Sequence, residues 1–275
     1  MAKYFLTVLV AVALVTVATT VTAADKLEGE LVSVQIKVDG QGAARMFAPN
    51  DVPPVQFGGL DDTTIFYRYA HLEVGDVYSI DVSPHNNRQR FGVGIAVDGQ
   101  FIAHKGAVPS DVSVPEAWGK RFGAAYVIGQ GAGHEFRGWR ETAGTGGTIR
   151  RFEVTKAKDS LAVKISNDAT AMRTIAIAVF REDYSPYMNS PELGSARGVG
   201  EKGIDIGTGI GERERSDTVS TVFKPKTLAW EVFVIRYGTK AELKQLGVWE
   251  DPTPPTPRNR LWPAPVAPGY GRLPE

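Results

Sequence analysis

Aromatic and basic side chains near the predicted loops are the residues of this chain best suited to bind a ligand. Three aromatic residues could offer flat apolar faces to sugar rings, and one histidine and two arginines lie near them in the sequence. The six candidate ligand-binding residues are Trp118, Arg121, Tyr126, His134, Trp139 and Arg140. An alternative place for Trp139 is the hydrophobic core, and Trp118 could instead anchor its own loop.

Recognisable catalytic motifs are missing from the sequence. It has no GxSxG serine motif and no HxH or HExxH metal motif, and its histidines are scattered at His71, His85, His104 and His134. A serine, histidine and aspartate triad is defined by geometry, so it stays open without support from spacing. A glycosidase pair also stays open, because it needs two acids about 5 to 9 Å apart in space. The candidates for that pair are Glu116, Glu135, Glu141 and Glu153.

Cofactor and metal motifs are equally weak. Gly198, Gly200 and Gly203 fit the GxGxxG pattern of dinucleotide sites, but neither the strand before that pattern nor the helix after it is evident. Aspartates in the early loops could bind calcium, although the EF-hand pattern is absent and loop aspartates commonly form turns. We therefore predict no cofactor and no metal site, and we expect a protein that is not an enzyme.

The first 23 residues have the composition of a secretory signal peptide. Lys3 supplies a short positive region, residues 5–17 are almost wholly apolar, and small residues follow at 21–24. The apolar run is shorter than the roughly 20 residues of a spanning helix, which argues against the alternative of an uncleaved anchor. No other segment of the sequence is long and apolar enough to cross a membrane. We expect cleavage of residues 1–23 and a periplasmic or extracellular mature protein without a membrane span.

The composition excludes several classes of function. The chain of 275 residues has no cysteine, so disulfides, thiol nucleophiles and thiolate metal sites are impossible. Lysine and arginine together number 31, as do aspartate and glutamate, so the formal net charge is zero. Bulk charge therefore predicts no nucleic-acid partner.

Short segments with alternating apolar and polar residues run through the middle of the chain. The clearest lies at 31–38, where valines and an isoleucine share one face, and Asp98-Gly99 is a strong hairpin signal. Such segments are too numerous for one small sheet, so two packed sheets are expected. We predict an all-β fold, an antiparallel two-sheet β-sandwich of jelly-roll type, over residues 24–184. One of its strands is expected at 161–165.

The composition changes after the predicted sandwich. Residues 185–216 are rich in glycine and charge, and we expect a long surface excursion there. Residues 217–250 should close the same domain with strands and one short helix, which Thr239 caps and Gly247 ends. Residues 251–275 hold eight of the 17 prolines. We expect this proline-rich tail either to stay in solvent or to recognise a partner.

Five short motifs follow one another through the strand region. They are YSI-V from Tyr78, VDG from Val97, GWR from Gly138, RF from Arg151 and IAIAVFRE from Ile175. Their order resembles the pattern shared by a group of uncharacterised exported bacterial proteins. The resemblance covers residues 78–182 and implies a secreted β-rich domain, with no catalytic residues to transfer.

These observations predict an exported, non-enzymatic β-sandwich that binds a cell-envelope or extracellular ligand, such as a glycan, or a protein partner. Its contacts are expected in the long loop at residues 105–122 and in the proline-rich tail. Two other functions stay open. One is a secreted hydrolase of polysaccharides or esters, and the other is a structural subunit that assembles through its sheet edges.

Overall fold

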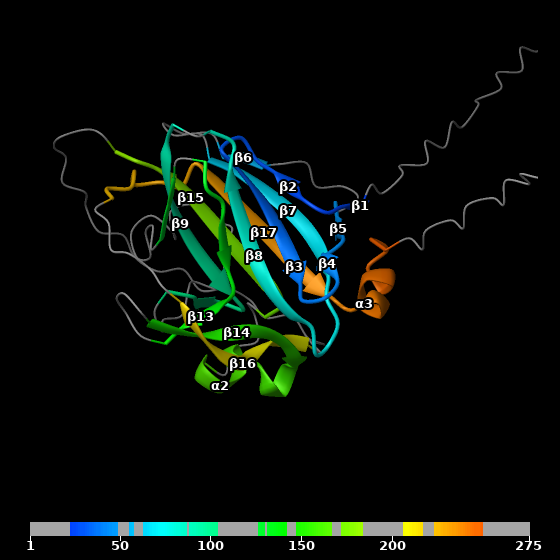
Figure 1. The fold of residues 1–275 in the computed structure, drawn as a ribbon. Helices are drawn as coiled ribbons and strands as arrows, with labels where there is room; N and C mark the ends of the chain where they lie inside the picture. The colour runs from blue at the N-terminus through cyan, green and yellow to red at the C-terminus, as the bar shows by residue number, and fades with distance from the viewer. Residues whose placement is uncertain are drawn as a thin grey trace, which may run out of the picture.

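Two β-sheets make up most of the chain that the structure describes. The computed structural model describes residues 23–48, 55–57, 63–86, 88–103, 126–129, 131–141, 147–166, 172–183, 206–216 and 223–249. Figure 1 shows the two sheets lying face to face, which confirms the predicted all-β fold of two packed sheets. The predicted signal peptide up to residue 22, the predicted loop at 105–122 and the predicted proline-rich tail at 251–275 lie outside the described residues.

The first sheet has the strand order β1-β5-β7-β17-β15-β9-β10, with β6 on β7 and β11 on β9. Its strands are β1 (Ala23–Ala24), β5 (Met46–Phe47), β6 (Val55–Phe57), β7 (Thr63–His71), β9 (Arg90–Val97), β10 (Gln100–Phe101), β11 (Tyr126–Gly129), β15 (Thr174–Arg181) and β17 (Glu231–Gly238). β7 and β17 run parallel, so this sheet is mixed where a purely antiparallel one was predicted. Parallel neighbours need a long crossover, and residues 72–230 separate these two strands.

The second sheet has the order β13-β14-β8-β3-β2, with β12 on β8, β16 on β14 and β4 on β3. Its strands are β2 (Leu27–Glu28), β3 (Val32–Val38), β4 (Gly42–Ala43), β8 (Val77–Pro84), β12 (His134–Phe136), β13 (Gly138–Arg140), β14 (Gly147–Lys156) and β16 (Ile206–Ser216). Every strand pair described in this sheet is antiparallel.

The main hydrophobic core lies between the two sheets. Val32, Val34 and Ile36 of β3 are fully buried, which confirms the alternation predicted at 31–38. Ile177 of β15 and Phe233 of β17 belong to the same cluster from the first sheet. Full burial of each such side chain stabilises the fold by about 1.5 to 3 kcal/mol. The core therefore holds together the two sheets whose edge strands form the site described below.

Two short α-helices are described, and one of them was not predicted. α3 (Lys240–Gln245) begins at Thr239 with a reciprocal capping box to Glu242, as the sequence indicates. α2 (Leu161–Ser166) follows the 3-10 turn η1 (Ala157–Asp159) and replaces the strand predicted at 161–165. The Ser160 hydroxyl accepts a hydrogen bond from the N–H of Val163, so a helix cap outweighs the strand preference of this short apolar run. No described helix is long and apolar enough to cross a membrane.

The predicted glycine-rich excursion at 185–216 ends in a strand, which corrects the sequence interpretation for residues 206–216. These residues form β16, and β16 pairs with β14 along most of its length. Glycine is needed for close packing at this place, because a Cβ on Gly209 would lie 2.4 Å from Cγ2 of Thr155. The glycines remove the apolar alternation by which a strand is normally predicted.

Candidate functional site

A pocket of about 220 Å³ opens where edge strands of the two sheets come together. Its walls come from β11 of the first sheet and from β12, β13, β14 and β16 of the second. The backbone N–H of Arg140 donates to the carbonyl of Ile102 over 2.9 Å. This hydrogen bond joins β13 to the segment after β10, so it holds the edges of the two sheets together beside the pocket.

Three of the six predicted ligand-binding residues line this pocket. They are Tyr126 on β11, His134 on β12 and Arg140 on β13. The sequence therefore grouped three residues that the fold also places in one pocket. Trp118 and Arg121 lie outside the described residues.

Trp139 occupies the alternative place that was considered for it, the hydrophobic core. Its side chain is 6% exposed, and its ring meets the ring of Phe152 edge to face at a centroid distance of 5.3 Å. The indole N–H donates to the carbonyl of Gly209 on β16 over 3.4 Å. Trp139 therefore supports the back of the pocket wall, where it links β13 to β16.

A row of three rings forms the aromatic side of the pocket. The ring of Phe136 meets Tyr126 at a centroid distance of 4.8 Å and His134 at 4.6 Å, in both cases close to perpendicular. Phe136 itself is buried, whereas His134 is exposed. Edge-to-face contacts of this kind hold rings in fixed orientations, so the row is a preformed surface.

Both polar members of the row are neutral at pH 7. Although His134 is exposed, the surrounding protein desolvates its ring enough to lower the pKa, against the opposing charges of Asp81 and Glu135. Burial raises the pKa of the Tyr126 hydroxyl, although the charge of Arg140 and a hydrogen bond to it act in the opposite direction. The pocket can thus offer a neutral imidazole, a phenol and a guanidinium to one ligand.

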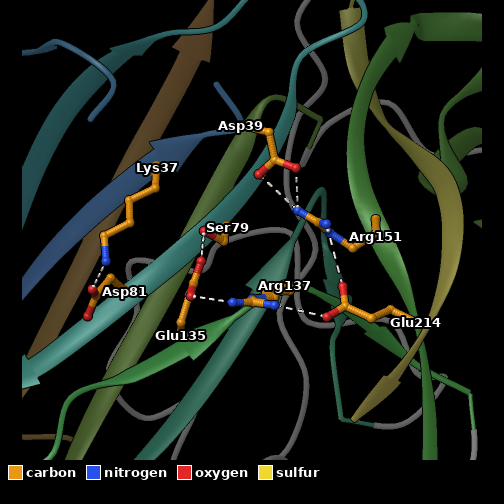
Figure 2. Close-up of polar contacts among 8 residues, drawn as sticks. All are labelled: Lys37, Asp39, Ser79, Asp81, Glu135, Arg137, Arg151 and Glu214. Atoms are coloured by element: carbon orange, nitrogen blue, oxygen red, sulfur yellow. Dashed lines mark hydrogen bonds and ion pairs between the residues drawn. The ribbon is translucent and has the colours of Figure 1, made fainter. Parts of the chain in front are cut away.

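Arg137 bridges the two carboxylates of the pocket. Its guanidinium donates to Oε2 of Glu135 over 3.1 Å and to Oε1 of Glu214 over 2.9 Å, as Figure 2 shows. Glu135 also accepts a 2.6 Å hydrogen bond from Ser79. Burial acts to raise the pKa of Glu135, but the bonds from Ser79 and Arg137 together bring it below its ordinary value.

This charge network continues across the outer side of the second sheet. Arg151 on β14 pairs with Glu214 over 3.5 Å and with Asp39 over 2.8 Å. Figure 2 places these side chains in the same region as the ion pair of Lys37 with Asp81. Exposed ion pairs contribute little to stability one by one, but a connected set fixes the geometry of its members. Arg137 and Glu214 are therefore held in defined positions at the pocket.

The sequence interpretation missed the residues that later strands bring to this site. Glu214 and Arg215 come from β16, and they line the pocket about 70 residues after the other walls. An alternating Glu-Arg-Glu-Arg run at 212–215 is the one signal that could have indicated a strand there. Glu135 had been considered only as a member of a glycosidase pair.

No group of three or more potential ligand side chains that could hold a metal ion is found among the residues that the structure describes. The two carboxylates of the pocket bond to Arg137 instead. Comparison of the chain with protein-family models, with curated proteins and with solved structures finds no match.

Proposed function

We propose that this chain is an exported, non-enzymatic β-sandwich protein that binds an acidic glycan in the pocket between the edge strands. The observation that carries the proposal is the composition of the pocket lining. Three arginines face two glutamates there, next to the row of rings. The pocket residues that carry this charge are Arg137, Arg140, Arg215, Glu135 and Glu214.

A sugar that carries a carboxylate matches this lining. Sugar rings pack their apolar faces on aromatic side chains, and Tyr126 and His134 belong to the preformed row. A guanidinium can bind a carboxylate through two parallel hydrogen bonds, which gives both strength and orientation. Arg140 lies beside Tyr126, so one ligand can contact a ring and a cation together.

The size of the pocket limits the part of the ligand that enters it. Its volume of about 220 Å³ is smaller than the roughly 300 to 1,000 Å³ of pockets that enclose drug-sized ligands. We therefore expect one terminal sugar unit to enter, with the rest of the glycan outside. The predicted loop at 105–122, including Trp118 and Arg121, is the expected place of further contacts.

The test is a binding measurement with matched probes. Oligosaccharides that end in a uronic acid are compared with the same oligosaccharides after reduction of that carboxyl to an alcohol. We expect binding of the acidic probe, at least tenfold weaker binding of the reduced probe, and a similar loss in Arg140→Gln. Arg213→Gln is the matched control, because Arg213 also lies on an edge strand near the pocket but bonds to Glu141. Equal binding of both probes, or of neither, would refute the proposal.

A secreted hydrolase is the second candidate, because the pocket contains the carboxylates Glu135 and Glu214. One member of a glycosidase pair must hold a proton near neutral pH, which requires a raised pKa. Hydrogen bonds instead leave the pKa of Glu135 lowered, and Arg137 forms ion pairs with both Glu135 and Glu214. The pair therefore suits ligand orientation better than acid catalysis. Release of sugar from a bound acidic oligosaccharide, abolished in Glu135→Gln, would favour the hydrolase.

A further inference from the structure

A buried carboxylate lies at the opposite end of β16 from the pocket. Asp98 occupies the turn between β9 and β10 with a φ of 48°, and it is 1% exposed. The backbone N–H of Thr208 on β16 donates to one carboxylate oxygen, and the hydroxyl of Tyr237 donates to the other over 2.8 Å. Asp98 therefore holds the start of β16 against the first sheet.

Two more hydroxyl contacts extend this buried cluster. The Thr208 hydroxyl lies 2.6 Å from the hydroxyl of Tyr237 and 2.9 Å from that of Tyr78. Tyr78 belongs to β8 of the second sheet and Tyr237 to β17 of the first. Thr208 is fully buried, so these polar groups must satisfy one another in place of water. The cluster thus ties β16 to both sheets at a single residue.

β16 depends on this cluster because its buried half has few side chains to pack. Ile206, Gly207, Thr208 and Gly209 are all buried, but only one of them has a large apolar side chain. A Cβ on Gly207 would lie 2.7 Å from both Met172 and Ser160, so a larger residue cannot supply the missing contacts there. Apolar burial therefore adds little to the pairing of this half of β16 with β14, and the polar bonds of Thr208 attach it to the first sheet.

We propose that Asp98 is a positioning residue of the pocket, which holds β16 in place through Thr208 and Tyr237. β16 runs from this anchor to Glu214, Arg215 and Ser216, which line the pocket, with one shift in its register against β14 on the way. Its release would let this wall shift, because only the pairing with β14 would then hold β16. The expected loss of ligand binding rests on the proposed function. The attachment of β16 by Asp98 does not depend on it.

The anchor responds to pH, because every group that bonds to Asp98 is neutral. Its donors are the Tyr237 hydroxyl and the backbone N–H groups of Thr208, Arg173 and Thr174. Burial raises the pKa of the carboxyl to about 7, which these hydrogen bonds only partly oppose. Burial and the charge of Asp98 also raise the pKa of Tyr78 and of Tyr237 well above the ordinary value, so both phenols stay neutral.

The direction of the pH effect follows from these values. Opening of β16 would bring the Asp98 carboxyl into water, where its pKa returns to about 3.8. The opened state therefore releases a proton between about pH 4 and pH 7, so a rise in pH favours opening. We expect β16 to open at least about tenfold more often at pH 8 than at pH 5.

The test is hydrogen exchange of the full chain at pH 5 and pH 8, corrected for the intrinsic exchange rate. We expect peptides of β16 to be less protected than those of β15, and their protection to fall at least about tenfold between the two pH values. Asp98→Asn should remove this fall, because asparagine is neutral at both values and tolerates a positive φ. Asp25→Asn should keep it, since Asp25 is an exposed residue between β1 and β2 and has no part in the charge network of the pocket.

Two results would overturn the proposal. One is an equal fall in the protection of β16 in Asp98→Asn, and the other is identical protection of β16 and β15 at both pH values. If Asp98→Asn does not fold, Tyr237→Phe decides in the same exchange measurement, because it removes the hydroxyl that bonds to Asp98 and Thr208, and unchanged protection of β16 in that variant would overturn the proposal. None of these measurements uses a glycan, so failure of glycan binding alone would refute only the proposed function.

Discussion

The hydroxyl of Tyr237 donates a 2.8 Å hydrogen bond to the carboxylate of Asp98, and both side chains are almost fully buried. This contact joins β17, in the interior of the first sheet, to the turn after β9. Through Thr208 the same pair of residues also holds β16, which belongs to the second sheet. A polar cluster therefore fastens the two sheets at one end, in addition to the apolar core between them.

Replacement of Tyr237 by phenylalanine tests this contact. Tyr237→Phe keeps the ring but removes a hydroxyl that bonds to both Asp98 and Thr208, so two buried groups lose a partner. We expect the free energy of unfolding to fall by about 1 to 3 kcal/mol, measured by urea denaturation. Tyr69→Phe on β7 is the control and should change it by less than about 0.5 kcal/mol. Equal effects of the two replacements would contradict a special role of the cluster.

The stability of the whole domain should depend on pH through Asp98. Folding raises the pKa of this carboxyl to about 7, so its contribution is fully present below about pH 4 and is lost as the pH rises through 7. We expect the free energy of unfolding to fall by about 2 to 3 kcal/mol between pH 5 and pH 8, measured by urea denaturation. Burial also raises the pKa of Glu231, which acts in the same direction.

Measurements between pH 5 and pH 8 separate the effect of Asp98 on the free energy of unfolding from the effect of the ion pairs. Hydrogen bonds from Arg213 and Arg150 lower the pKa of Glu141 to about 2, so its contribution is lost only in acid. Asp98→Asn should therefore lose most of the fall over the same window and keep only the smaller part that comes from Glu231. A flat profile in the unmodified chain would show that Asp98 is ionised throughout it.

The sequence predicts the strands and turns of this fold better than it predicts which polar side chains are buried. The alternation of β3 and the Asp98-Gly99 turn were predicted correctly, because period and turn chemistry are local properties. The burial of Asp98 was not foreseen, since a turn aspartate is ordinarily exposed. Its partners Thr208 and Tyr237 lie 110 and 139 residues away, and no local pattern reports such a contact.

The candidate site was predicted only in part, because some of its residues are close in the sequence and others are distant. Tyr126, His134 and Arg140 lie within one stretch of sequence, so their proximity could be anticipated. Arg215 lies on β16. This strand was not predicted, because its glycines interrupt the apolar alternation that normally indicates a strand. The site therefore depends on a strand that only the tertiary structure reveals.

Gly138 tests how closely β13 and β14 must approach beside the pocket. A Cβ on this residue would lie 1.9 Å from the backbone carbonyl oxygen of Arg150, and neither backbone can move away without breaking the pairing. We expect Gly138→Ala to lower the free energy of unfolding by about 3 kcal/mol in urea denaturation, and to weaken probe binding.

Gly40→Ala is the comparison for this prediction. Gly40 has a φ of 73°, but no atom lies within 4 Å of the place that a Cβ would take, so only backbone strain of about 1 kcal/mol is expected. A cost at Gly138 no larger than the cost at Gly40 would mean that the two strands can separate freely.

The charges of β16 predict that the protein does not assemble through this edge. β16 pairs only with β14 among the described strands, so its other side is a possible edge for a second copy. Directly opposite residues of an antiparallel pair point to the same face of the sheet. Glu212 and Glu214 share one face and Arg213 and Arg215 share the other, so a two-fold pairing would set like charges opposite each other.

We therefore expect a monomer in light scattering coupled to size-exclusion chromatography, which would count against the structural-subunit alternative. Replacement of both Arg213 and Arg215 by threonine removes the repulsion on one face and raises the strand propensity, so this variant should associate more than the unmodified chain. Arg181 and Arg236 lie on strands inside the first sheet, and their replacement by threonine is the matched control. A stable dimer of the unmodified chain at low salt would contradict the prediction, because unscreened like charges oppose that pairing most strongly there.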